Sequence, residues 1–110
     1  MRSATNPAFD DGDFASGIAA AGTTAATATT LPANHCEVAT VSDGQGVIVK
    51  AYPAGEVFSV SNAGSGANLL VYPPTGAAFN GKAADVPVTL PRHTACHGRF
   101  LTAAKIILLF

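Results

Sequence analysis

Hydrophobic and polar residues alternate over short segments after residue 34, and glycine or proline separates these segments. Between Glu56 and Ser61, for example, the large apolar residues Phe58 and Val60 stand at every second position. A period of two is typical of a strand with unlike faces. The pattern predicts strands at 36–41, 47–52, 56–61, 68–72, 77–79, 86–90, 94–102 and 105–110. Seven to eight short strands at intervals of roughly eight to twelve residues favour an all-β fold, either a small β-sandwich or a barrel.

The turns between the predicted strands follow from local chemistry. Pro73-Pro74 lacks the N–H donors that a central strand needs, and Asn80-Gly81 tolerates the positive φ of a tight turn. Pro87 predicts an edge strand or a bulge for the same reason as the double proline. Residues 49–55 resemble residues 69–76, and we interpret the two phrases as two hairpins built alike.

Residues 1–33 differ from the rest because they are rich in alanine, threonine and glycine, with few bulky residues. Phe14 and Ile18 are spaced to share one face of a short helical turn, although the glycines and threonines disfavour a long helix. The segment lacks the apolar bulk to fold alone. We therefore predict an extended N-terminal arm at 1–33 and a compact β domain at 34–110, with a disordered tail as the alternative for the arm.

The most hydrophobic run in the chain is residues 106–110, next to Lys105. If exposed, such a charge-free run of high β propensity promotes aggregation. We expect a final strand with one face on the core and the other face in a subunit contact. The predicted interface residues are Ile106, Leu108 and Phe110.

Composition narrows the class of protein. The chain has 110 residues, no tryptophan and 48% hydrophobic residues, many of them alanine, which predicts a thin core and stability gained by oligomerisation. Charged residues make up 12% and the net charge is −1, so we expect no nucleic-acid partner. No apolar stretch approaches the roughly 18 residues of a membrane span, and the start of the chain lacks a secretory apolar core. We expect no membrane partner and synthesis in the cytoplasm.

The densest set of metal-ligating residue types is His35-Cys36 together with His93, Cys96 and His97. Neighbours in a strand point to opposite faces, and the spacing matches no zinc motif, so we expect no metal and no cofactor. In a chain made in the cytosol, free buried thiols are expected more often than a disulfide. No acid, base and nucleophile can be assembled from the pattern, and we expect a protein that is not an enzyme.

Three segments, 17–31, 56–64 and 71–81, resemble a recurrent pattern in small virion proteins of tailed bacteriophages, either capsid decoration (cement) proteins or modules of head and tail fibres. The resemblance implies a non-enzymatic β protein that is often trimeric. The leading expectation is a decoration protein on the capsid surface of the virion, a homotrimer that stabilises the head shell by binding the major capsid protein. The alternative is a fibre module that binds a host glycan or another tail protein through exposed Tyr52 and Tyr72.

In the leading interpretation the arm contacts the major capsid protein. Its apolar anchors and acidic contacts are Phe9, Asp10, Asp11, Asp13, Phe14 and Ile18.

Overall fold

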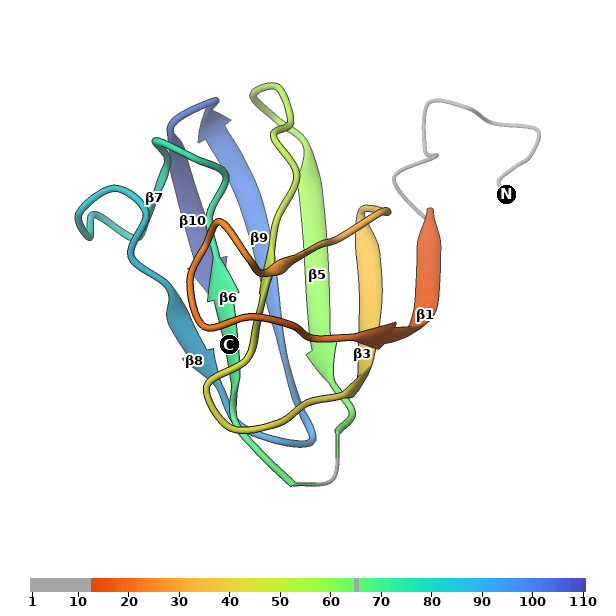
Figure 1. Ribbon diagram of the computed structural model, residues 1–110. Helices are drawn as coiled ribbons and strands as arrows, with labels where there is room; N and C mark the ends of the chain where they lie inside the picture. The colour runs from red at the N-terminus through yellow and green to blue at the C-terminus, as the bar shows by residue number, and fades with distance from the viewer. Residues whose placement is uncertain (1–12, 65) are drawn as a thin grey trace.

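Two β-sheets face each other across one core in the computed structural model, which describes residues 13–64 and 66–110 and shows no helix in them (Figure 1). The larger sheet has the strand order β1-β3-β5-β9-β10-β7, and the smaller sheet has the order β2-β4-β6-β8. The prediction of an all-β fold is therefore confirmed. The strands are β1 Phe14–Ala19, β2 Thr29–Thr30, β3 His35–Thr40, β4 Gly46–Ile48, β5 Val57–Asn62, β6 Leu69–Tyr72, β7 Ala78–Phe79, β8 Val88–Leu90, β9 Thr94–Thr102 and β10 Lys105–Leu109.

The first six strands wind back and forth between the sheets. β1, β3 and β5 are parallel neighbours in the larger sheet, and β2, β4 and β6 are parallel neighbours in the smaller one. Parallel neighbours need a crossover connection, and here a strand of the opposite sheet lies in each connection. The two similar phrases at 49–55 and 69–76 therefore do not form two hairpins. Residues 49–55 follow β4, whereas residues 69–76 contain β6 and the turn after it. β4 and β6 are parallel neighbours, with Ile48 opposite Tyr72.

Residues 13–33, predicted as part of an extended arm, are instead built into both sheets. β1 forms an edge of the larger sheet beside β3, and β2 forms an edge of the smaller sheet beside β4. Ala20 and Leu31 are buried in the shared core. Small residues suffice here because the strands gain main-chain hydrogen bonds and need only a few apolar side chains. Residues 1–12 lie outside the described part of the chain.

The core fills the space between the sheets with side chains from alternate positions of the strands. Phe79, Phe100, Leu69, Leu90 and Ile106 are among its largest fully buried side chains. The Phe100 ring meets the rings of Phe58 and Tyr52 edge to face, with ring centroids 5.7 Å apart in both pairs. Edge-to-face aromatic pairs stabilise a core beyond their buried area.

Asn62 is a buried polar residue at the end of β5, and its amide joins the two sheets. Its Nδ2 donates to the carbonyl oxygens of Ala67 (3.0 Å) and Leu90 (2.9 Å), and its Oδ1 accepts the N–H of Gly64 (3.0 Å). Because Leu90 belongs to the smaller sheet, these bonds fix the end of β5 against β8. Because these polar atoms are hydrogen-bonded, their bonds offset the free-energy cost of burying the amide.

The predicted turn at Asn80-Gly81 is confirmed. Both residues have positive φ, 49° and 75°, and the N–H of Lys82 donates to the carbonyl of Phe79 at 2.8 Å. The Asn80 side chain also pairs with the main chain of Leu108, accepting its N–H at 2.8 Å and donating to its carbonyl at 3.1 Å. The turn is thereby fixed against β10, and it holds Lys82 at the edge of the larger sheet.

Candidate functional site

The outer face of the larger sheet turns away from the smaller sheet, and we treat it as the candidate site. Strict alternation builds this face: in β5 the even residues are buried and the odd residues are partly exposed. In β10 the pattern is the same, with Ile106 and Leu108 buried and their neighbours exposed. The pleat of a strand sends successive side chains to opposite faces, so one set makes the core and the other makes this surface.

A row of residues crosses five adjacent strands at one level of the outer face. The pairing register places Phe14, His35, Ser59, His97 and Leu109 opposite one another in turn. His35 Nδ1 and Ser59 Oγ are 2.7 Å apart and share a hydrogen bond. The row brings two imidazoles, one hydroxyl and two apolar side chains together from five separate strands.

The His35–Ser59 pair does not form a catalytic arrangement with the rest of the described chain. A catalytic serine–histidine pair needs a third group that orients the imidazole and N–H donors that stabilise an oxyanion. No carboxylate among residues 13–64 and 66–110 is hydrogen-bonded to His35. The N–H groups of His35 and Ser59 donate within the sheet, to the carbonyls of Asp13 and Asn34.

A hollow of about 470 Å³ lies on this face over β5, β9 and β10. Most of its lining is apolar, and a guanidinium and two imidazoles complete it. The lining residues are His35, Val57, Phe58, His97, Gly98, Arg99, Leu101, Ile107 and Leu109.

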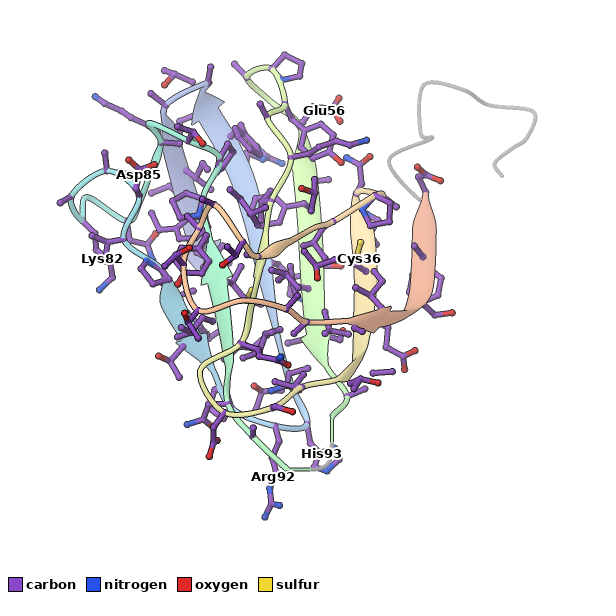
Figure 2. The ribbon with its side chains drawn as sticks, in the orientation of Figure 1. Cys36, Glu56, Lys82, Asp85, Arg92 and His93 are labelled. Carbon is purple, nitrogen blue, oxygen red and sulfur yellow. The ribbon has the colours of Figure 1, made fainter. Side chains whose placement is uncertain are left out.

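A second hollow of about 320 Å³ lies beside the first, toward β7. Leu101 and Ile107 line both hollows and form the wall between them. The rest of its lining includes Lys82, from the turn after β7, and Lys105, at the start of β10. Figure 2 shows Lys82 on the loop that follows β7, at the edge of the molecule. We call the two adjoining hollows the trough.

The trough is basic. Arg99 lines the first hollow, Lys82 and Lys105 line the second, and no aspartate or glutamate among residues 13–64 and 66–110 lines either one. None of these three cations has an ion pair or a side-chain hydrogen bond within the described residues. In that part of the chain the carboxylates lie elsewhere; Glu56, for example, accepts a hydrogen bond from Asn34 at 3.2 Å, and Asp85 accepts one from the N–H of Gly76 at 2.7 Å. Among the described residues, the trough therefore pairs exposed apolar surface with positive charge that no lining carboxylate offsets, although Glu37 of β3 lies elsewhere on the same face.

The two cysteines point away from this face, into the core. Both are buried and neither forms a disulfide (Figure 2 labels Cys36 on β3). Burial raises the pKa of Cys36, and it raises the pKa of Cys96 from 9.0 to about 11, because a thiolate is poorly solvated there. His35 and His97 face outward, so the histidines and cysteines are split between the two faces. No group of three or more metal-ligating side chains occurs in the residues that the structure describes.

The predicted partner-binding residues are separated by the structure. Phe9, Asp10 and Asp11 lie outside the described residues. Phe14 is 64% exposed on the outer face, whereas Ile18 packs against the core, so the two do not share a face. A strand with an irregularity between them replaces the helical turn that would have aligned them. Asp13 is exposed immediately before β1, and its carbonyl accepts the N–H of His35.

The predicted subunit-interface residues are also divided. Ile106 and Leu108 are 1% and 4% exposed because they face the core, whereas Phe110 is 67% exposed. The last strand has the expected core face and open face, but the even residues Ile106 and Leu108, predicted to form the open face, form the core face instead. Its open face carries Ile107 and Leu109, which are 44% and 67% exposed.

The tyrosines expected in an exposed groove are not placed there. Tyr72 is buried, with its ring over Gly46 and its hydroxyl donating to the carbonyl of Thr23 at 3.3 Å. Tyr52 packs against the core, edge to face with Phe100. The glycan-binding groove drawn from these two side chains is therefore not formed.

The trough residues Arg99, Leu101 and Ile107 were not among the predicted site residues. The sequence signal for Arg99 and Leu101 is the alternation across 94–102. Cys96, Gly98 and Phe100 form the core-facing set, and the residues between them form the outward-facing set. Lys82 lies far from these residues in sequence, and only the pairing of β7 with β10 brings it to the same surface.

Comparisons with known proteins give no match for this chain. No family model matches it, and no curated protein and no solved structure is significantly similar. The described residues also include no helix of the length and hydrophobicity needed to cross a membrane.

Proposed function

We propose that the protein is a structural component of a tailed-bacteriophage virion, a capsid decoration protein that stabilises the head shell by binding the major capsid protein. It acts at the capsid surface as a homotrimer and without catalytic activity. The starting point is the resemblance of segments 17–31, 56–64 and 71–81 to small virion proteins.

The single observation that carries the proposal is the open, apolar outer face of the larger sheet. Leu101, Ile107 and Leu109 expose 44–67% of their surface on one part of this face. Exposed apolar clusters of this kind mark contact surfaces in proteins, because water solvates them poorly. A small two-sheet body with one covered and one open sheet face is suited to lie against a larger assembly.

Trimer formation fits this task. A weak contact repeated three times on a symmetric lattice gives an avidity far above that of one contact, since the second and third contacts form at high effective concentration.

The first described strand also supports the proposed role of the preceding residues. β1 forms the sheet edge, so Phe9, Asp10 and Asp11 precede an edge strand of the same sheet.

The test mixes the purified protein with expanded, undecorated heads of the phage that encodes it. We expect co-sedimentation with the heads, and regular density at junctions between shell subunits in cryo-electron microscopy. Density confined to the tail would instead favour the fibre-module alternative, and no binding to either part would overturn the virion role.

The role of the residues before β1 is tested by deleting residues 2–12. A larger deletion, of residues 2–30, would remove β1 and β2 and would confuse loss of binding with loss of folding. The shorter deletion leaves both sheets intact, so thermal unfolding should be nearly unchanged while head binding is lost. Head binding at full strength by this variant would remove Phe9, Asp10 and Asp11 from the contact.

A further inference from the structure

We infer that the trough on the outer face of the larger sheet binds an extended peptide segment that carries two apolar side chains flanked by carboxylates. If the proposed function holds, the segment belongs to the shell protein, and this source rests on that proposal. The chemistry of the occupant is argued from the trough itself.

The apolar part of the occupant follows from the two hollows. They share Leu101 and Ile107 as a common wall, so they lie next to each other across β10. In an extended chain, side chains on one face recur about every 7 Å, and neighbouring strands of a sheet lie about 4.8 Å apart. We therefore expect two alternate side chains of an extended segment that crosses β9 and β10 to enter successive hollows.

The acidic part follows from charge. Arg99 stands at the first hollow, and Lys82 and Lys105 stand at the second. None of them is paired with a carboxylate in the part of the chain that the structure describes. Carboxylates placed at the two ends of the apolar pair would meet a guanidinium at one end and ammonium groups at the other. Charge-assisted hydrogen bonds of this kind are among the stronger polar contacts in proteins.

An extended segment fits better than a compact ligand because the trough lies on an open sheet face. The main chain of the larger sheet is already paired across β5, β9 and β10, so this surface offers side chains and few main-chain partners. A peptide lying on it keeps its own main chain in water and buries only alternate side chains. Its main-chain N–H and C=O groups therefore stay hydrated, and binding does not require water to be removed from them.

The probe is the synthetic peptide Asp-Ser-Leu-Ser-Leu-Ser-Asp, which presents two leucines between two aspartates on one face when extended. It is titrated into the full-length ¹⁵N-labelled protein, and binding is followed by amide chemical shifts. We expect the largest shifts at Leu101, Ile107 and their neighbours on β9 and β10. A matched peptide with asparagine in place of both aspartates should bind about tenfold more weakly.

Two protein variants locate the charge contact. Arg99→Gln removes the cation of the first hollow and should weaken binding of the acidic peptide by about tenfold, with little effect on the asparagine peptide. Lys50→Gln removes one positive charge from a residue that lines neither hollow and should leave binding unchanged. Thermal unfolding of both variants checks that the fold is retained.

Several outcomes would overturn the inference. No peptide binding, equal binding of both peptides, or shifts centred away from β9 and β10 would each do so. Sedimentation equilibrium of the protein alone, repeated with Leu109→Asp, tests whether a second copy already covers the trough; association abolished by that substitution would assign the face to the subunit contact. Binding of sodium decanoate in the trough without binding of the peptide would assign it to a fatty acyl anion.

The peptide experiment needs no phage heads, so its failure is separate from a failure of the proposed function. Peptide binding together with no head binding would support the trough as a peptide-binding site and contradict the virion role. Head binding that Arg99→Gln leaves intact, without peptide binding, would keep the virion role and reject the trough as its contact.

Discussion

The two faces of β9 and β10 are made from alternating residues of the same two strands, yet one face is a closed core and the other an open surface. Ile106 is 1% exposed and Ile107 is 44% exposed, although they are adjacent and chemically identical. The pleat, and not the hydrophobicity of the residue, decides which of the two is covered. The difference teaches that an apolar residue on this sheet stabilises the fold if its side chain faces the core. If its side chain faces outward, it is available for contact with another molecule.

The covered face is also closely fitted, whereas the open face is hollowed. On the covered face, Gly98 lies between Phe58 on β5 and Leu108 on β10, and the Phe58 ring occupies the place of a Gly98 side chain. On the open face, the side chains around Arg99 leave the trough unfilled. We therefore expect changes on the covered face to cost stability, and changes on the open face to leave stability nearly constant.

The largest effect is expected from truncating Phe100 on the covered face. Phe100→Ala should lower the free energy of unfolding by about 3–5 kcal/mol, because it removes a fully buried ring and leaves a cavity beside Phe58 and Tyr52. Leu101→Ala, one residue further on the open face, should cost less than about 1 kcal/mol. Urea unfolding measures both, and similar costs for the two would contradict the division of faces.

A smaller loss is expected from adding one methyl group to the covered face. Gly98→Ala should cost about 3 kcal/mol, because the new Cβ overlaps the Phe58 ring and lies 3.0 Å from Cδ1 of Leu108. Gly66→Ala is the matched control, since its added Cβ would have no atom within 4 Å, and its effect should stay within about 0.5 kcal/mol. Thermal and urea unfolding of the two variants compare them. Equal stability of Gly98→Ala and the unmodified protein would show that the covered face is looser than described.

Much of the fold was accessible from the sequence, because most strands carry a clear alternation and end at recognisable turns. The last long strand was predicted as 94–102, the bounds that β9 has in the structure. β1 and β2 were missed because their residues are mainly alanine, glycine, serine and threonine, which give no period-two signal of hydrophobicity. They are strands for a reason that the pattern does not contain, namely main-chain pairing with β3 and β4.

The site was less accessible than the fold. The division of the last strand into two faces was foreseen, but its parity was not, because a run of five apolar residues reads equally well in either register. The structure settles it by pairing Ile106 with Phe100 and Phe79, two core residues. Lys82 could not be placed in the site from sequence, since its position depends on the parallel pairing of β7 with β10 and on the Asn80-Gly81 turn.

An effect on the order of 2 kcal/mol is expected from the Cys96 thiol, whose pKa is raised from 9.0 to about 11 by burial on the covered face. The folded pKa lies above the unfolded one, so this contribution is complete below about pH 9 and is lost as the pH rises through about 11. The stability advantage of the unmodified protein over Cys96→Ala should therefore shrink between pH 8 and pH 10.5. Urea unfolding at several pH values measures it, and a constant difference across that range would mean that Cys96 is solvated in the folded state.

The smallest effect is expected from removing one methylene group from each of two adjacent isoleucines, Ile106 and Ile107. Because the side chains are identical, this pair gives the sharpest comparison of the two faces. Ile106→Val should cost about 0.5–1.5 kcal/mol, because Ile106 is fully buried, and both substitutions keep a β-branched side chain suited to a strand. Ile107→Val should change the free energy of unfolding by less than about 0.5 kcal/mol. Urea unfolding at two protein concentrations distinguishes two ways for this to fail. A cost at Ile107 that is equal to the cost at Ile106 and independent of concentration would mean that the open face is covered within one chain. A cost that grows with protein concentration would mean that another copy covers it.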